Sequence, residues 1–298
     1  MRRLWTEVAR LRRPRGFANA EGGSVEQQRD QRLLLHHCAN YAAVLSLLRG
    51  IGRRLRLLEL GCGSGALSCA FARVMPDGWE LVATDYSAAL IAHARANYRQ
   101  TNLRFEQLDV REAGLGRIAD RDAVLMLEVI EHLSADVASG LLHGVHRQLR
   151  SGARFVITTL DRSAYSRPFS GYPPHVVEYS FRSIKARLAD SAWNPFRRFT
   201  VYRLVSPRIT EEAVRAEDRF GYVLNRLNRL AVSLCVHQHE VERLRQRVAA
   251  SVFRVYSGFP RNDKFDLESY LRTLRLTGGD AEAYDRSSFG LVLELVKE

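Results

Sequence analysis

The sequence predicts an α/β fold in which a mostly parallel sheet of seven strands carries helices on both faces. Three observations lead to this prediction: short apolar runs alternate with helical stretches from Leu55 to Leu160, a glycine-rich turn follows the first run, and acidic residues end several runs. Alternation favours parallel pairing, because each helix returns the chain to the starting edge of the sheet. Ligands of such sheets bind at the carboxyl ends of the strands, so the acidic ends mark the expected site.

Each predicted element follows from its local pattern. Short runs of β-branched and other apolar residues bounded by turn residues predict strands, and apolar residues three and four positions apart predict helices. The predicted strands are 55–61, 79–85, 103–110, 122–129, 153–160, 197–205 and 289–297. The predicted helices are 24–49, 66–74, 87–98 and 134–149.

These elements divide the chain into a basic and helical segment (1–49), a core (50–205), a helical insertion before the last strand (206–287) and the final sheet strand (288–298). The last two predicted strands can pair as a hairpin at the sheet edge, with an insertion between them far longer than an ordinary hairpin loop. From Phe220 to Val248, apolar positions alternate three and four residues apart. This heptad pattern predicts a coiled coil, which could form a homodimer, or a long antiparallel helix pair. Packing against the chain's own domain is the alternative. Residues 265–276 predict a second amphipathic helix.

The basic charge points only weakly to nucleic acid. The 298 residues carry a formal net charge of +12, but residues 1–60 hold 12 Arg against 5 acidic residues, so much of the excess lies near the N-terminus. There, Leu4 and Val8 share one helical face among arginines. This pattern fits either a membrane-surface helix or a basic helix laid over the domain.

The composition favours a soluble, cytoplasmic protein. No apolar run approaches the roughly 20 residues that a transmembrane helix needs. The four cysteines (Cys38, Cys62, Cys69 and Cys235) have neither the spacing of a zinc site nor the density of a disulfide scaffold. A reducing compartment is therefore expected.

A glycine-rich turn joins the first predicted strand to the next helix. The stretch "LLELGCGSGALS" (57–68) places Glu59 two residues before Gly61, with Gly63 and Gly65 at alternate positions after it. Glycines allow a sharp turn and let a ligand approach the backbone without a Cβ in the way. The third glycine comes two residues after the second, whereas in the dinucleotide-binding fingerprint it comes three residues after the second. An NAD enzyme is therefore a minor alternative.

This arrangement resembles motif I of the class I S-adenosylmethionine (SAM) methyltransferases. The resemblance covers about residues 50–205 and implies a Rossmann-like, SAM-binding core. It implies that Asp85 accepts hydrogen bonds from the ribose hydroxyls and that Asp109 contacts the adenine amine. Carboxylates suit both roles, because the hydroxyls and the amine are hydrogen-bond donors. The implied cofactor-binding residues are Glu59, Gly61, Cys62, Gly63, Gly65, Asp85, Tyr86, Asp109, Val110 and Leu127.

Three ionisable residues follow the fourth predicted strand in "MLEVIEHL" (126–133). Glu128, Glu131 and His132 fall at i, i+3 and i+4, a spacing that brings them to one side of a helical turn. His132 alone could act as a general base. A Pro- and Gly-rich loop then leads to His175.

The pattern E-x-x-E-H followed by a later His resembles ubiquinone-biosynthesis O-methyltransferases and small-RNA 3′-end 2′-O-methyltransferases. In the RNA enzymes Glu, Glu, His and His hold a divalent metal. The resemblance implies that Glu128, Glu131, His132 and His175 are catalytic and hold Mg, Mn or Zn, since a bound dication makes a hydroxyl easier to ionise. Metal-free participation of His132 and a purely structural role remain the alternatives.

The acceptor is expected to be a small hydroxylated molecule, because the loop "SRPFSGYPPH" offers aromatic and proline surface. Tyr165, Phe169 and Tyr172 are the expected substrate residues. RNA methylation at a 3′ end is the first alternative, although Tyr179 stands where the RNA enzymes have Trp. A non-catalytic, SAM-binding interaction module is the second.

Overall fold

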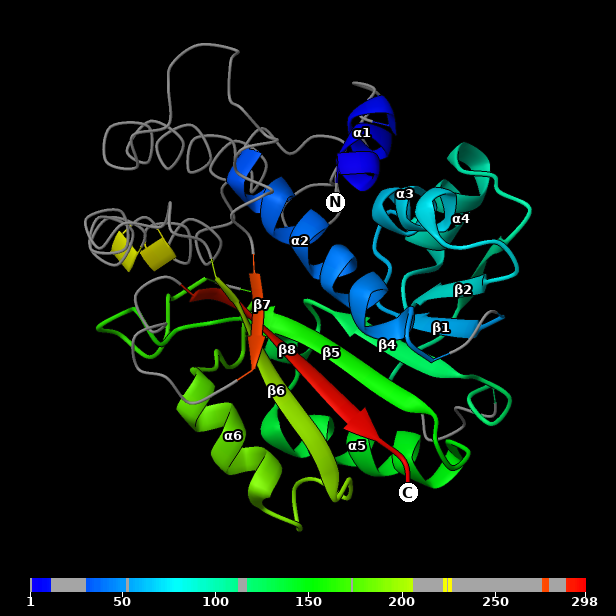
Figure 1. Cartoon of the computed structure of the whole chain (residues 1–298). Coiled ribbons are helices and arrows are strands. Elements are labelled where there is room, and N and C mark those ends of the chain that lie inside the picture. The colour runs from blue at the N-terminus through cyan, green and yellow to red at the C-terminus, as the bar shows by residue number, and fades with distance from the viewer. Residues whose placement is uncertain are drawn as a thin grey trace.

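A computed structural model of the chain (Figure 1) describes residues 2–11, 31–51, 54–111, 117–172, 174–205, 222–223, 225–226, 275–278 and 288–298. The described residues form one sheet in the order β3-β2-β1-β4-β5-β8-β6-β7. The strands from β3 to β5 run parallel, whereas β8, β6 and β7 pair antiparallel. The predicted α/β, mostly parallel fold is confirmed, with eight strands where seven were expected.

The strands fall where the apolar runs predicted them. Their bounds are β1 Arg56–Leu60, β2 Glu80–Asp85, β3 Leu103–Gln107, β4 Ala123–Leu127, β5 Arg154–Leu160, β6 Arg198–Val205, β7 Arg275–Gly278 and β8 Ser288–Val296. Every residue of β4 is buried, as expected for a central parallel strand covered on both faces.

The helices are α1 Arg2–Leu11, α2 Gln31–Leu48, α3 Ala66–Val74, α4 Ala88–Asn97, α5 Ala135–Gln148 and α6 Phe181–Ala189, with a short 3₁₀ turn, η2, at Ile130–His132. Ser87 and Ser134 start α4 and α5 by accepting the backbone N–H groups of Leu90 and Val137. Such caps satisfy amide donors that the first helical turn leaves without partners.

The helices cover the two faces of the sheet in separate layers (Figure 1). Side chains of α1 to α4 pack with Leu57, Leu81 and Leu125 in one apolar cluster. Side chains of α5 and α6 pack with Leu58 and Val124 in the other. Neighbouring strand residues thus face opposite layers, which is the alternation of a pleated strand.

β7 corrects two expectations about the sheet edge. β6 and β8 do pair, but β7 pairs with the other side of β6, so the edge is not a simple hairpin of the last two predicted strands. Arg275 and Leu276, predicted to end a helix, belong to this strand instead. Leu276 lies opposite Leu204 of β6, so pairing gives the β6 backbone groups partners that a helix could not supply.

The N-terminal helix α1 lies over the domain. Leu4 and Val8 are each 1 % exposed and belong to the cluster that includes α3. Arg73 of α3 donates to Glu7 of α1 at 2.9 Å. The apolar face of α1 is thus buried within the chain, which favours the covering role over a membrane-surface helix.

Most of the predicted insertion lies outside the described residues, including almost all of the heptad pattern. The predicted homodimer therefore stays a prediction. Among the described helices, none combines the length and the apolar character needed to cross a bilayer.

Candidate active site

The two motifs meet at one edge of the sheet. β1 and β4 are neighbours with parallel register, and Leu60 pairs with Met126. The glycine turn that follows β1 and the acidic stretch that follows β4 therefore leave the sheet side by side. The strand order also reverses between β1 and β4, and ligands of open α/β sheets bind at such a point.

The glycines of this turn are required for different reasons. All three have a left-handed backbone, with φ of +82° at Gly61, +57° at Gly63 and +83° at Gly65. A Cβ on Gly65 would come within 2.7 Å of Ala94 and Phe105, so this glycine lets the turn pack against α4 and β3. A Cβ on Gly63 would meet nothing within 4 Å. Gly63 therefore borders space that a ligand can use.

Alanine at these two glycines is expected to separate folding from ligand binding. Gly65→Ala should lower the free energy of unfolding by about 2–4 kcal/mol, because it adds both a steric clash and backbone strain. Gly63→Ala should cost only about 1 kcal/mol of backbone strain but weaken binding of S-adenosylhomocysteine, because its methyl group enters the open space. Urea unfolding and calorimetry measure the two effects; equal stability losses with unchanged binding would contradict this assignment.

Asp85 ends β2 and links the glycine turn to the start of α4 through its two carboxylate oxygens. The Gly63 N–H donates to Oδ2 and the Ser87 N–H donates to Oδ1, each at 2.9 Å. These bonds fix the carboxylate next to the open space at Gly63. This is the place that the ribose-binding prediction requires.

Asp109 lies near an exposed aromatic ring. The Arg111 side chain donates to both Asp109 oxygens, and this contact lowers the pKa of the Asp109 carboxyl. Arg111 also lies 5.9 Å from the centre of the Tyr86 ring, and Tyr86 is 52 % exposed. A flat apolar surface and an ionised acceptor thus occur together, as an adenine ring would need.

Glu59 is buried beneath the turn and is held by α2. Its carboxylate accepts a short hydrogen bond from the Tyr41 hydroxyl. Burial raises the pKa of Glu59. Its second oxygen has no hydrogen-bond partner among the residues that the structure describes, so Glu59 retains a buried acceptor for a donor group.

The remaining predicted cofactor residues are mostly packed. Cys62 and Leu127 are buried, and Val110 packs at the edge of the α5 and α6 layer. Burial raises the pKa of Cys62 well above its ordinary value, which makes this thiol an inert part of the wall.

Glu128 turns away from the strand with an unusual backbone. It is the one non-glycine residue with positive φ (57°) in the described part of the chain. Its Oε1 accepts from Asn40 at 2.9 Å and Thr158 at 3.2 Å, and its Oε2 lies 2.8 Å from His36 Nε2. Burial opposes ionisation, but His36, the nearby His37 and the Thr158 hydrogen bond lower the pKa of Glu128 to about 2.

Removing the His36 side chain should leave this buried carboxylate poorly compensated. His36→Ala is expected to lower the free energy of unfolding by about 3–5 kcal/mol, as for other broken buried ion pairs. His143→Ala is the matched control, since His143 is half-buried but lies on α5 and contacts the Ala192 carbonyl oxygen. Urea unfolding compares the two; equal losses would show that the His36–Glu128 contact contributes little.

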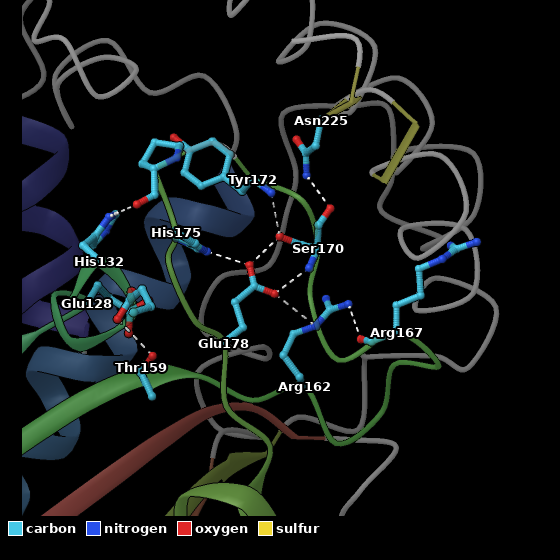
Figure 2. A network of polar contacts seen from close by, with 12 residues as sticks. Glu128, His132, Thr159, Arg162, Arg167, Ser170, Tyr172, His175, Glu178 and Asn225 are labelled. Atoms are coloured by element: carbon cyan, nitrogen blue, oxygen red, sulfur yellow. Dashed lines mark hydrogen bonds and ion pairs between the residues drawn. The ribbon is translucent and has the colours of Figure 1, made fainter. Parts of the chain in front are cut away.

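Glu131, His132 and His175 form one group, and its two histidines are labelled in Figure 2. One donor atom from each lies within 4.8 Å of the others. The predicted fourth member, Glu128, is not part of this group. Glu131 is 1 % exposed, and its carboxylate accepts from Thr159 at 3.0 Å.

Three hydrogen bonds bring the distant loop to this group. The backbone carbonyl of Glu131 accepts from Val176 at 2.8 Å and Val177 at 3.1 Å. His132 Nδ1 lies 3.0 Å from the carbonyl oxygen of Pro174 and must donate to it. His175 is thereby carried next to η2, and its ring centre lies 5.0 Å from that of His132.

The electrostatics of the group favour a cation. Burial, and then the Glu128 charge, raise the pKa of Glu131 well above its ordinary value. A bound dication would stabilise the ionised form and relieve this cost. One carboxylate and two imidazoles are also donors that first-row divalent metals accept, so the residues present fit the predicted ion.

Of the three predicted substrate residues, Tyr172 contacts this group. Its ring lies 4.8 Å from the His175 ring. Tyr165 instead packs under Arg162, whose guanidinium lies 3.7 Å from the ring centre. Phe169 is half-buried in the same loop.

Sequence reasoning missed the contribution of α2. His36, Asn40 and Tyr41 reach the acidic strand ends, and their i, i+4 and i+5 positions on a predicted helix were the available signal. It also missed Glu178, whose only signal was its place three residues after His175.

Comparisons with known proteins find a matching domain family, relatives and a solved structure. Residues 57–152 match a protein family described as "Methyltransferase domain". The chain is 34 % identical over 172 residues to a ubiquinone biosynthesis O-methyltransferase of Ruegeria pomeroyi, covering 57 % of this chain and 64 % of the relative. A Cereibacter sphaeroides protein of the same name is 34 % identical over 113 residues, 38 % of this chain and 44 % of its own. The chain thus spans between 44 % and 64 % of the length of these relatives.

A solved structure shares the fold. Haemonchus contortus phosphoethanolamine N-methyltransferase 2, solved with S-adenosylhomocysteine, aligns with a TM-score of 0.50 at 16 % identity, covering 86 % of this chain and 52 % of its own. The domain match, the relatives and the fold together define the class: residues 57–152 match a methyltransferase domain, and the chain has the fold of class I SAM-dependent methyltransferases.

Proposed function

We propose that this protein transfers a methyl group from SAM to a hydroxyl of a small molecule. The observation that carries the proposal is the meeting of the glycine turn and the Glu131–His132–His175 group at the reversal point between β1 and β4. The similarity to ubiquinone biosynthesis O-methyltransferases supports an oxygen acceptor.

SAM supplies an activated methyl group on its sulfonium. The chain's part is to bind and align it, which is the main source of rate in such in-line transfers. The open side of Gly63 would take the cofactor, Asp85 would accept from its ribose hydroxyls, and Glu59 would accept from its amino group. Tyr86 and Asp109 would hold the adenine.

A divalent metal, when bound, would lower the pKa of an acceptor hydroxyl. Glu131, His132 and His175 would hold it. Glu128 would remain with His36 and Asn40, and its charge would add to the negative field of the site. If the site works without metal, His132 Nε2 is the atom that takes the hydroxyl proton, because Nδ1 is engaged by Pro174.

The acceptor would approach over Tyr172, whose ring packs against His175. An aromatic wall suits a planar, hydroxylated compound such as a catechol. A charged backbone such as RNA would instead need basic groups along its path.

The direct test supplies methyl-labelled SAM with two kinds of acceptor, a panel of catechols and short RNAs with free 3′ ends. Label in a catechol, with none in RNA, is the expected result. Label at an RNA 3′ end would replace the small-molecule proposal. Binding of S-adenosylhomocysteine without transfer to any acceptor, under conditions where a known catechol methyltransferase is active, would favour a non-catalytic module.

A further inference from the structure

Glu178 lies at the centre of the polar network that surrounds His175 (Figure 2). Its side chain is 0 % exposed. Oε2 accepts from the Ser170 N–H at 2.8 Å and faces Arg162 Nε at 3.3 Å. Oε1 accepts a short bond from the Ser170 hydroxyl and lies 2.6 Å from His175 Nδ1. Three donor groups and one imidazole nitrogen therefore surround one buried carboxylate.

This carboxylate fixes where the His175 proton sits. Oε2 faces two groups that can only donate, the Ser170 N–H and the Arg162 guanidinium, and a carboxylate that carries no proton can only accept hydrogen bonds. His175 Nδ1 must therefore be the protonated nitrogen. In the neutral ring, Nε2 is then left as an unprotonated acceptor. Pro174 imposes the same choice on His132 through its carbonyl oxygen.

We propose that Glu178 is a positioning residue for His175, holding the ring with its proton on Nδ1 so that Nε2 serves the group with Glu131 and His132. A histidine that binds a metal, or accepts a hydrogen bond from a substrate, needs this tautomer and a fixed ring. The use made of Nε2 rests on the proposed function. The tautomer itself does not.

Glutamine at position 178 is the informative change. The Gln side chain has the same shape but carries one acceptor oxygen and one donor group. With its oxygen toward His175, its amide group would point at the Ser170 N–H, and two donors would face each other. The reverse orientation relieves that conflict but places a donor at His175 Nδ1. The His175 proton then moves to Nε2.

The test is the protonation pattern of His175, read from long-range ¹H–¹⁵N correlations of the imidazole in the full-length, metal-free chain. Wild type should show the proton on Nδ1, and Glu178→Gln should show it mainly on Nε2. Glu294→Gln is the matched control, because Glu294 is also a buried carboxylate bound by an arginine and a hydroxyl, far along the sheet. It should leave His175 unchanged.

A second readout uses Mn²⁺ alone, with free Mn²⁺ measured by electron paramagnetic resonance. Glu178→Gln should weaken binding by about 10- to 100-fold, as loss of such supporting carboxylates does elsewhere, whereas Glu294→Gln should not. If wild type binds no Mn²⁺, the proposed metal is contradicted, and the tautomer alone decides the role of Glu178.

Two results would overturn the proposal. One is a wild-type His175 with its proton on Nε2, which requires no variant to observe. The other is a folded Glu178→Gln protein with the Nδ1 proton retained. Ser170→Ala, which removes a donor to Glu178 but not the His175 contact, should keep the wild-type tautomer and guards against an effect of loop disruption alone.

Discussion

Replacing His175 with alanine is expected to lower methyl transfer by about 100-fold or more while leaving the affinity for S-adenosylhomocysteine unchanged. The reason is that His175 lies with Glu131 and His132, whereas the cofactor residues lie around the glycine turn. Removing metal with EDTA should have the same effect. Transfer to a catechol measures the loss, and calorimetry measures the retained cofactor affinity.

His143→Ala is the matched control, because His143 lies on α5 and contacts the Ala192 carbonyl oxygen. It should retain transfer. Restoration of the EDTA-treated enzyme by Mg²⁺ or Mn²⁺ but not by Ca²⁺ would indicate a compact site. Full transfer in EDTA, together with a near wild-type His175→Ala enzyme, would refute the metal and leave His132 as the base.

Replacing Asp85 with alanine is expected to weaken S-adenosylhomocysteine binding by about 100-fold or more, since each hydrogen bond to a charged group contributes about 1.5–3 kcal/mol. The change removes the proposed acceptor for the ribose hydroxyls. It also frees the Gly63 and Ser87 N–H groups that Asp85 now orders. Calorimetry on the folded variant measures the loss.

Asp190→Ala provides the comparison for this loss. Asp190 also ends a regular element and accepts a backbone N–H, from Ala192 at 2.9 Å, but it lies beyond α6. It should bind S-adenosylhomocysteine as tightly as wild type. An Asp85→Ala protein that binds equally well would place the ribose elsewhere.

Local pattern was enough to predict most elements of the core. Ser87 and Ser134 marked helix starts because their hydroxyls cap the first turn, and the glycines at 61–65 marked the turn because only glycine adopts that backbone freely. The apolar run 79–85 predicted Asp85 at the carboxyl end of a strand, where the structure has it, and parallel strands bring these ends to one edge.

Contacts between segments that are far apart along the chain could not be predicted from the sequence. β7 pairs with β6 across a long insertion, and no periodicity within 265–276 distinguishes a strand from a helix end. A helical pattern also predicts that α2 is amphipathic without telling which strand its face covers. Hence the partners of Glu128 were missed, and the i, i+3, i+4 spacing could not show that Glu128 bonds to α2 whereas Glu131 and His132 group with His175.

The bond from His132 to Pro174 illustrates the same limit at the site. The E-x-x-E-H…H motif predicted that His132 and His175 act in one site. The position of His175, however, is determined by two backbone hydrogen bonds to the Glu131 carbonyl and by the contact from His132 to Pro174. Such bonds depend on the conformation of the loop, and no pattern of residues in the sequence predicts them.

The most direct test of the central claim is calorimetric titration of the full-length chain with S-adenosylhomocysteine. The expected result is one site of micromolar affinity that is weakened by Asp85→Ala and Gly63→Ala and kept in His175→Ala. No binding by the folded protein at high micromolar ligand would contradict the assignment of this sheet edge as a SAM site.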